Sequence, residues 1–80
     1  MKARIHITLK EGVLDPQGKA IQLALGDMGF DGVEGVRQGK YIEVDLAETD
    51  ATKAKAALDE MCKKLLSNTV IENYTIDLDN

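Results

Sequence analysis

The chain has 80 residues and a mass of 8.7 kDa, the size of one small domain (1–80) with a thin hydrophobic core. Ten basic residues against 14 acidic ones give a net charge of −4, which excludes a nucleic-acid binder and argues against an anionic membrane surface. There is no apolar stretch of transmembrane length, no signal-peptide pattern and only one cysteine. We therefore expect a cytoplasmic domain without disulfides.

The first half of the chain predicts a strand followed by a helix. Apolar and polar residues alternate from Arg4 to Lys10, which is the period of a strand with one buried face. Asp15 and Pro16 mark a helix start, because Asp caps free backbone N–H groups and Pro suits the first helical position. Gly29 is placed to end this helix in the left-handed conformation. The apolar stripe of the helix consists of Ala20, Ile21, Ala24, Leu25 and Met28.

The middle of the chain predicts two strands joined by a tight turn. Val33 and Val36 lie in a short, glycine-flanked strand. We expect Gln38 and Gly39 to form a hairpin turn, since glycine accepts a positive φ without penalty. The returning strand is clearer, because apolar residues alternate strictly with polar ones from residue 41 to residue 46.

The last third predicts a second helix and a final strand. Thr49 and Asp50 supply the cap of this helix, and Ser67 and Asn68 end it. Alternation from residue 73 to residue 79 indicates a strand. The helical stripe consists of Ala54, Ala57, Leu58, Met61, Cys62, Leu65 and Leu66.

The predicted order is strand, helix, strand, strand, helix, strand. Each helix has one apolar stripe and each strand one apolar face, so we expect an α+β two-layer sandwich. Two helices would cover one face of a four-stranded, mainly antiparallel sheet, in a ferredoxin-like or related arrangement. The opposite face has no partner within the chain, and it includes Arg4, His6, Thr8, Lys10, Glu43, Asp45 and Thr75.

No group of residues in the sequence assembles an active site. The run from Gly12 to Lys19 resembles a phosphate loop, but five residues separate its glycines where the motif has four, and Ala20 replaces the magnesium-binding hydroxyl. Cys62 and His6 are the available nucleophile and base, yet they fall on the helix layer and on the opposite face of the sheet. That separation and the missing second thiol exclude a zinc or copper site. We expect no catalytic residue, metal or cofactor in this chain.

Three runs of the sequence resemble a known family. They are TLKEGVLDPQGKA (Thr8 to Ala20), VRQGKYIEVDL (Val36 to Leu46) and MCKKLLSNTVIENYTI (Met61 to Ile76). In this order they resemble the PurS family, the small subunit of phosphoribosylformylglycinamidine (FGAM) synthase. The resemblance covers most of the chain.

The resemblance implies a non-catalytic subunit of a ligase complex. In that family a glutaminase subunit releases ammonia, and a large synthetase subunit uses ATP and magnesium to convert formylglycinamide ribonucleotide into formylglycinamidine ribonucleotide in purine biosynthesis. The small subunit assembles these two partners, supports ammonia transfer and forms homodimers or higher homo-oligomers. The candidate subunit-contact residues on the matching motifs are Asp15, Pro16, Gln17, Gly18, Arg37, Gly39 and Lys40.

Among these candidates, Gln17, Arg37 and Lys40 are the more specific predictions of subunit contact, because backbone geometry does not explain their presence in the motifs. From the residues alone, Arg37 and Lys40 also fit a solvated turn paired with nearby acids. The alternative function is a regulatory module of the ACT type, with the same element order, which would bind an amino acid around Glu11 to Gly18. A third class, an acylphosphatase-like enzyme, needs a phosphate cradle that the sequence does not supply.

Overall fold

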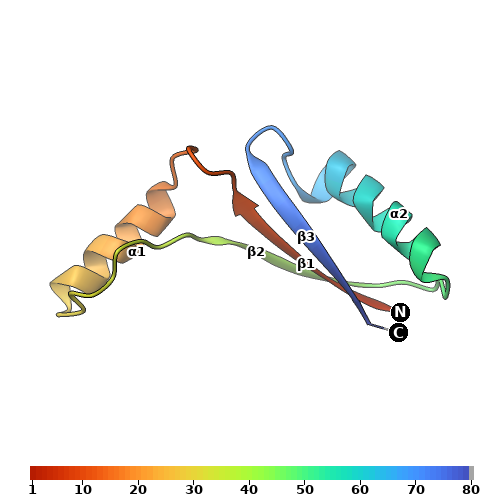
Figure 1. Cartoon of the computed structure of the whole chain (residues 1–80), viewed down its shortest axis with the longest axis horizontal. Coiled ribbons are helices and arrows are strands. Elements are labelled where there is room, and N and C mark those ends of the chain that lie inside the picture. The colour runs from red at the N-terminus through yellow and green to blue at the C-terminus, as the bar shows by residue number, and fades with distance from the viewer. Residues whose placement is uncertain (80) are drawn as a thin grey trace.

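The computed structural model describes residues 1–79 and combines one sheet with two α-helices (Figure 1). The elements in chain order are β1 (Lys2–Leu9), α1 (Pro16–Asp27), β2 (Gly39–Asp45), α2 (Ala51–Met61), the π-helical turn η1 (Cys62–Leu66) and β3 (Glu72–Asp79). In this part of the chain, every helix is too short or too polar to cross a membrane.

The sheet has three antiparallel strands in the order β2-β1-β3, so β1 is the central strand. Ile5 of β1 lies opposite Ile42 of β2 and Ile76 of β3. Successive side chains of a strand point to opposite faces, and this register places the apolar residues of all three strands on one face. The alternation predicted for these strands is therefore confirmed.

One face of the sheet is covered by α2 and η1 (Figure 1). Fully buried side chains come from the central strand and from the helix above it, and hydrophobic residues of β2 and β3 pack around them. The core therefore lies between β1 and α2, as expected for a helix whose apolar stripe faces a sheet. Its buried hydrophobic residues are Ala3, Ile5, Ile7, Ala54, Leu58 and Cys62.

The π-helical turn changes which residues of the predicted stripe are buried. The Ser67 N–H donates to the Cys62 carbonyl, five residues earlier, at 3.0 Å. This wider turn keeps Leu66 partly buried against the core but turns Leu65 outward, with 83% of its surface exposed. The prediction that Leu65 belongs to the buried stripe is therefore wrong, because it assumed α-helical spacing up to Leu66. Ala57 was also predicted in the stripe, but it is exposed on α2 itself.

The α+β class is confirmed, but the four-strand count is not. Within residues 1–79, Val33 and Val36 lie outside any strand, and Gly39 begins β2 instead of closing a hairpin turn with Gln38. The two valines are three residues apart, a spacing that cannot place both on one face of a strand. In addition, β1 already has a partner on each side, and the segment before β2 runs beside α1 (Figure 1).

The first helix lies beyond the end of the sheet, apart from α2 (Figure 1). This corrects the prediction that both helices cover one face. The molecule measures 48 × 25 × 14 Å, and its radius of gyration is 16.0 Å. A compact domain of this length would have about 12 Å. The apolar stripe of α1 therefore stays largely uncovered by the described chain, with 40% of Ile21 and 71% of Met28 exposed.

Candidate functional site

Asp15 joins the beginning of α1 to the beginning of β2. It caps the helix as predicted, since its Oδ1 accepts a hydrogen bond from the Gly18 N–H at 2.8 Å. Its Oδ2 accepts a second bond from the Gln38 N–H at 3.0 Å. Pro16 takes the first helical position, and Gly29, with φ +96°, follows the end of the helix. One carboxylate therefore connects the two motif-bearing segments.

The hydrogen bonds to Asp15 also fix its charge. The Gln38 and Gly18 N–H groups, in that order of effect, lower the pKa of the Asp15 carboxyl, and the positive charge of Arg37 lowers it further. Asp15 therefore remains ionised at neutral pH and serves as a permanent acceptor between the two segments.

Two motif glycines are required by close approach of backbone segments. A Cβ on Gly18 would lie 2.4 Å from the Val36 carbonyl oxygen, and a Cβ on Gly39 would lie 2.2 Å from that of Ile7. Both distances are far below van der Waals contact, so no larger residue fits without moving the backbone. Gly18 holds α1 against the segment before β2, and Gly39 lets β2 begin beside β1.

The remaining motif side chains line two cavities. One, the Lys40 cavity, has a volume of about 230 Å³ and is lined by Leu9, Asp15, Gln17, Gln38, Gly39, Lys40 and Glu72. Lys40 Nζ lies 3.4 Å from Glu72 Oε2 at the start of β3, and only 15% of the Glu72 side chain is exposed. The charge of Lys40 is therefore already paired within the chain.

The second cavity, the Arg37 cavity, has a volume of about 440 Å³ and lies between the start of α1 and the segment before β2. Arg37 and Lys19 both line it, together with Asp15, Gln22 and apolar residues. Arg37 and Lys40, predicted as a pair of docking residues, therefore line different cavities that share Asp15. Lys19, Gln38 and Glu72 were not predicted. All three lie within the motif runs, but the position of Glu72 beside Lys40 follows only from the strand order.

Cys62 and His6 are separated by the sheet, as predicted. Cys62 is fully buried among the core residues, and burial raises the pKa of its thiol. His6 is exposed on the opposite face, where its ring contacts Tyr41 edge-to-face with centroids 5.0 Å apart. Among residues 1–79, no cluster of three or more His, Cys, Asp or Glu side chains is arranged to hold a metal ion. Cys62 and His6 therefore do not form a nucleophile–base pair with each other.

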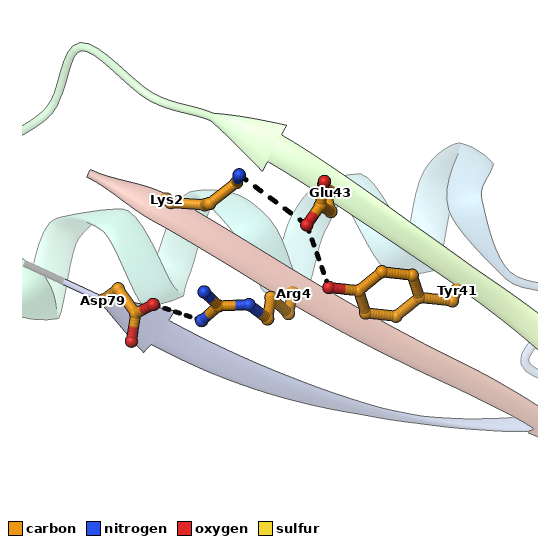
Figure 2. Close-up of polar contacts among 5 residues, drawn as sticks. All are labelled: Lys2, Arg4, Tyr41, Glu43 and Asp79. Atoms are coloured by element: carbon orange, nitrogen blue, oxygen red, sulfur yellow. Dashed lines mark hydrogen bonds and ion pairs between the residues drawn. The ribbon is translucent and has the colours of Figure 1, made fainter.

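The polar face of the sheet carries charges that pair with one another (Figure 2). Lys2 Nζ lies 3.7 Å from Glu43 Oε2, and the Tyr41 hydroxyl donates to the same carboxylate at 3.0 Å. Arg4 forms an ion pair with Asp79, and this contact raises the pKa of the Arg4 guanidinium. Such exposed pairs stabilise a fold by less than about 1 kcal/mol each, so this face is mainly a solvated surface in the single chain.

Comparison with known proteins identifies the family. A family model described as "PurS: Phosphoribosylformylglycinamidine (FGAM) synthase" matches residues 2–80. The chain belongs to the PurS family. The PurS subunit from Synechocystis is 52% identical over 94% of this chain and 75% of its own length. The subunit from Bacillus subtilis is 45% identical over 98% of this chain and 92% of its own length.

Solved PurS structures have the same fold. The C2 crystal form of B. subtilis PurS superposes with a TM-score of 0.90 at 44% identity, covering 99% of this chain and 98% of that one. A chain in the structure of PurLQS from Thermotoga maritima gives a TM-score of 0.87 at 29% identity, covering 95% of this chain and 93% of that one. These matches favour the PurS prediction over the ACT-type alternative. The elongated shape with α1 beyond the sheet is therefore shared with known PurS chains.

Proposed function

We propose that this chain is the PurS subunit of FGAM synthase in de novo purine biosynthesis and that it joins the synthetase subunit PurL to the glutaminase subunit PurQ. The observation that supports this best is the match to the PurS family over residues 2–80, together with the likeness to a chain of the Thermotoga PurLQS structure. In this role PurQ releases ammonia from glutamine, and PurL uses ATP and magnesium to form formylglycinamidine ribonucleotide.

The contribution of this chain is assembly and support of ammonia transfer. Cys62 is buried on one side of the sheet and His6 is exposed on the other, and the proposal assigns neither of them a catalytic role. The chain binds no cofactor in this proposal, and it acts in the cytoplasm.

The proposed contacts with PurL and PurQ lie at the end of the molecule where α1 meets β2. Asp15, Pro16, Gly18 and Gly39 shape this end through the cap and the two close approaches. Gln17 and Arg37 are exposed there and are free to contact another subunit. Lys40 is exposed as well, although it is paired with Glu72. The proposed contact residues are Asp15, Pro16, Gln17, Gly18, Arg37, Gly39 and Lys40.

We also propose that the chain forms a homodimer or a higher homo-oligomer. Large hydrophobic side chains are exposed along and just after α1, which is costly for a soluble monomer and is relieved by burial against another copy. They include Ile21, Leu23, Met28 and Phe30, with exposed fractions of 40%, 60%, 71% and 56%. Sedimentation equilibrium of the purified chain tests this, since a monomer throughout the micromolar range would contradict it.

Reconstitution tests the assembly function. Purified PurL and PurQ are assayed with and without this chain, first with glutamine and then with ammonium chloride as the nitrogen source. We expect the chain to be required for the glutamine-dependent reaction and to have little effect on the ammonia-dependent one. If PurL and PurQ form a complex and use glutamine equally well without the chain, the proposed function is wrong.

A further inference from the structure

The lining of the Arg37 cavity has a net positive charge, because it contains two cations and one acid. Arg37 and Lys19 line this cavity, and neither forms an ion pair with a residue in 1–79. Asp15 is the acid in the lining, but both of its carboxylate oxygens accept backbone N–H groups. By contrast, Lys40 in the neighbouring cavity is paired with Glu72. The two cations are thus available to an outside acceptor.

The same cavity has an apolar wall. Val13, Leu14 and Val36 contribute to its lining, and 79% of the Leu14 surface is exposed. A small free anion would contact the cations but leave Leu14 in water. An acidic side chain on a protein surface would bring a carboxylate to the cations and apolar neighbours to Leu14 at the same time. The combination of charge and exposed apolar surface therefore fits a protein partner better.

The local charge also contrasts with the whole molecule. The chain has a net charge of −4, so an acidic partner surface is repelled by most of it and attracted only where cations are concentrated. Lys19 extends from α1 and Arg37 from the segment before β2, and the Asp15 and Gly18 contacts hold these two segments together. The fold therefore holds together the two backbone segments that carry these cations.

We propose that the Arg37 cavity receives an acidic side chain, Asp or Glu, from PurL or PurQ, with Arg37 and Lys19 as its two cationic contacts. This inference rests on the proposed function, which requires such partners. It differs from the sequence prediction by replacing Lys40 with Lys19 as the companion of Arg37.

The test compares two double charge reversals that change the net charge equally. Lys19→Glu/Arg37→Glu removes the proposed contacts, whereas Lys53→Glu/Lys55→Glu alters exposed lysines of α2. Each protein is titrated into a PurL–PurQ mixture by isothermal titration calorimetry, after circular dichroism confirms its fold. We expect the first variant to bind at least about tenfold more weakly and the control to stay within about twofold of the unchanged chain.

A variant with neutral side chains keeps the test valid if the charge-reversed protein does not fold. Lys19→Gln/Arg37→Gln should also weaken binding, and its affinity should depend less on salt concentration than that of the unchanged chain. Equal affinity and equal salt dependence of the neutral variant and the unchanged chain would overturn the inference while leaving the proposed function intact.

Two further outcomes separate the remaining explanations. If the isolated chain binds inorganic phosphate, and the charge reversal abolishes that binding without weakening subunit assembly, the cavity is a small-anion site and the inference is wrong. If the unchanged chain neither binds PurL and PurQ nor supports the glutamine-dependent reaction, the proposed function fails and the inference fails with it.

Discussion

Tyr74 donates its phenolic hydrogen to Asp59 Oδ1 across 2.6 Å, and this bond ties β3 to α2 at the edge of the core. The acceptor carboxylate raises the pKa of Tyr74 to about 12. The same bond lowers the pKa of Asp59, with a smaller contribution from the charge of Lys63. The hydrogen bond therefore stabilises the fold when the Tyr74 hydroxyl is protonated and the Asp59 carboxylate is ionised.

The bond should make stability depend on pH at both ends of the scale. Because the folded-state pKa of Tyr74 is raised, its contribution is complete below pH 10, the usual phenol value, and is lost as pH rises towards about 12. Because the pKa of Asp59 is lowered, its contribution is complete above the usual value of 3.8 and is lost as pH falls through the lowered pKa.

Tyr74→Phe should therefore lower the urea midpoint at pH 7, and the difference from the unchanged chain should shrink as pH rises from 10 towards 12. Asp59→Asn provides the matched variant for a double-mutant cycle, in which the two losses should be less than additive. A difference that stays constant across this pH range would show that the bond does not form in solution.

Asp15→Asn should loosen the connection between α1 and β2. The Gly18 and Gln38 N–H groups bond to different oxygens of Asp15, so in asparagine one of them would face an NH2 group, which donates and does not accept. We expect faster hydrogen exchange at these two amides, with Asp31→Asn in the exposed loop as the control. In the unchanged chain, the lowered pKa of Asp15 means that this protection is complete above pH 3.8 and is lost as pH falls through the lowered pKa. Unchanged protection in Asp15→Asn would contradict the assignment.

Gly18→Ala and Gly26→Ala should have opposite effects although both lie in α1. A Cβ at position 18 meets the Val36 carbonyl oxygen, whereas a Cβ at position 26 meets nothing within 4 Å. Gly26→Ala should stabilise α1 by about 0.5–1 kcal/mol through helix propensity. Gly18→Ala should push α1 away from the segment before β2. Circular dichroism and amide exchange of α1 measure both effects, and equal behaviour of the two variants would rule out the close approach.

Leu58→Ala tests the position of the core between β1 and α2. Leu58 is fully buried, so its truncation should cost about 2–5 kcal/mol of unfolding free energy. Leu65→Ala is the matched control, because Leu65 is 83% exposed after the π-helical turn. Its truncation should change stability by less than about 0.5 kcal/mol. A large loss for Leu65→Ala, measured by urea unfolding, would mean that the predicted stripe continues through η1 or that a partner covers this side chain.

The elements with a regular pattern could be predicted from the sequence, and the packing of α1 could not. Strict alternation in β1, β2 and β3 and the caps at Asp15 and Asp50 correspond to local preferences that tertiary structure preserves. The apolar stripe of α1 indicates that some surface covers this side of the helix, but it does not identify that surface. Whether the covering surface belongs to the same chain depends on the direction of the helix, which is set by Asp15 and Gly18 through contacts with residues about 20 positions away.

The candidate site shows the same division. Gln17, Arg37 and Lys40 could be selected because local geometry gives them no structural role. Their sorting into two cavities could not be predicted, because Lys40 finds Glu72 only after β3 is placed in the sheet. The expected strand at Val33 and Val36 failed for a related reason, since the sequence does not show that both edges of β1 are already occupied.

Because α1 extends beyond the sheet, a small rotation at its first turn produces a larger displacement at its far end. The helix has 12 residues and is therefore about 18 Å long. A rotation of about 10° at its first turn would move its far end by about 3 Å. Met28 and Phe30 lie at that far end and are largely exposed. A small change at Asp15 or Gly18 would thus displace the apolar surface around Met28 and Phe30 without altering a single residue within it.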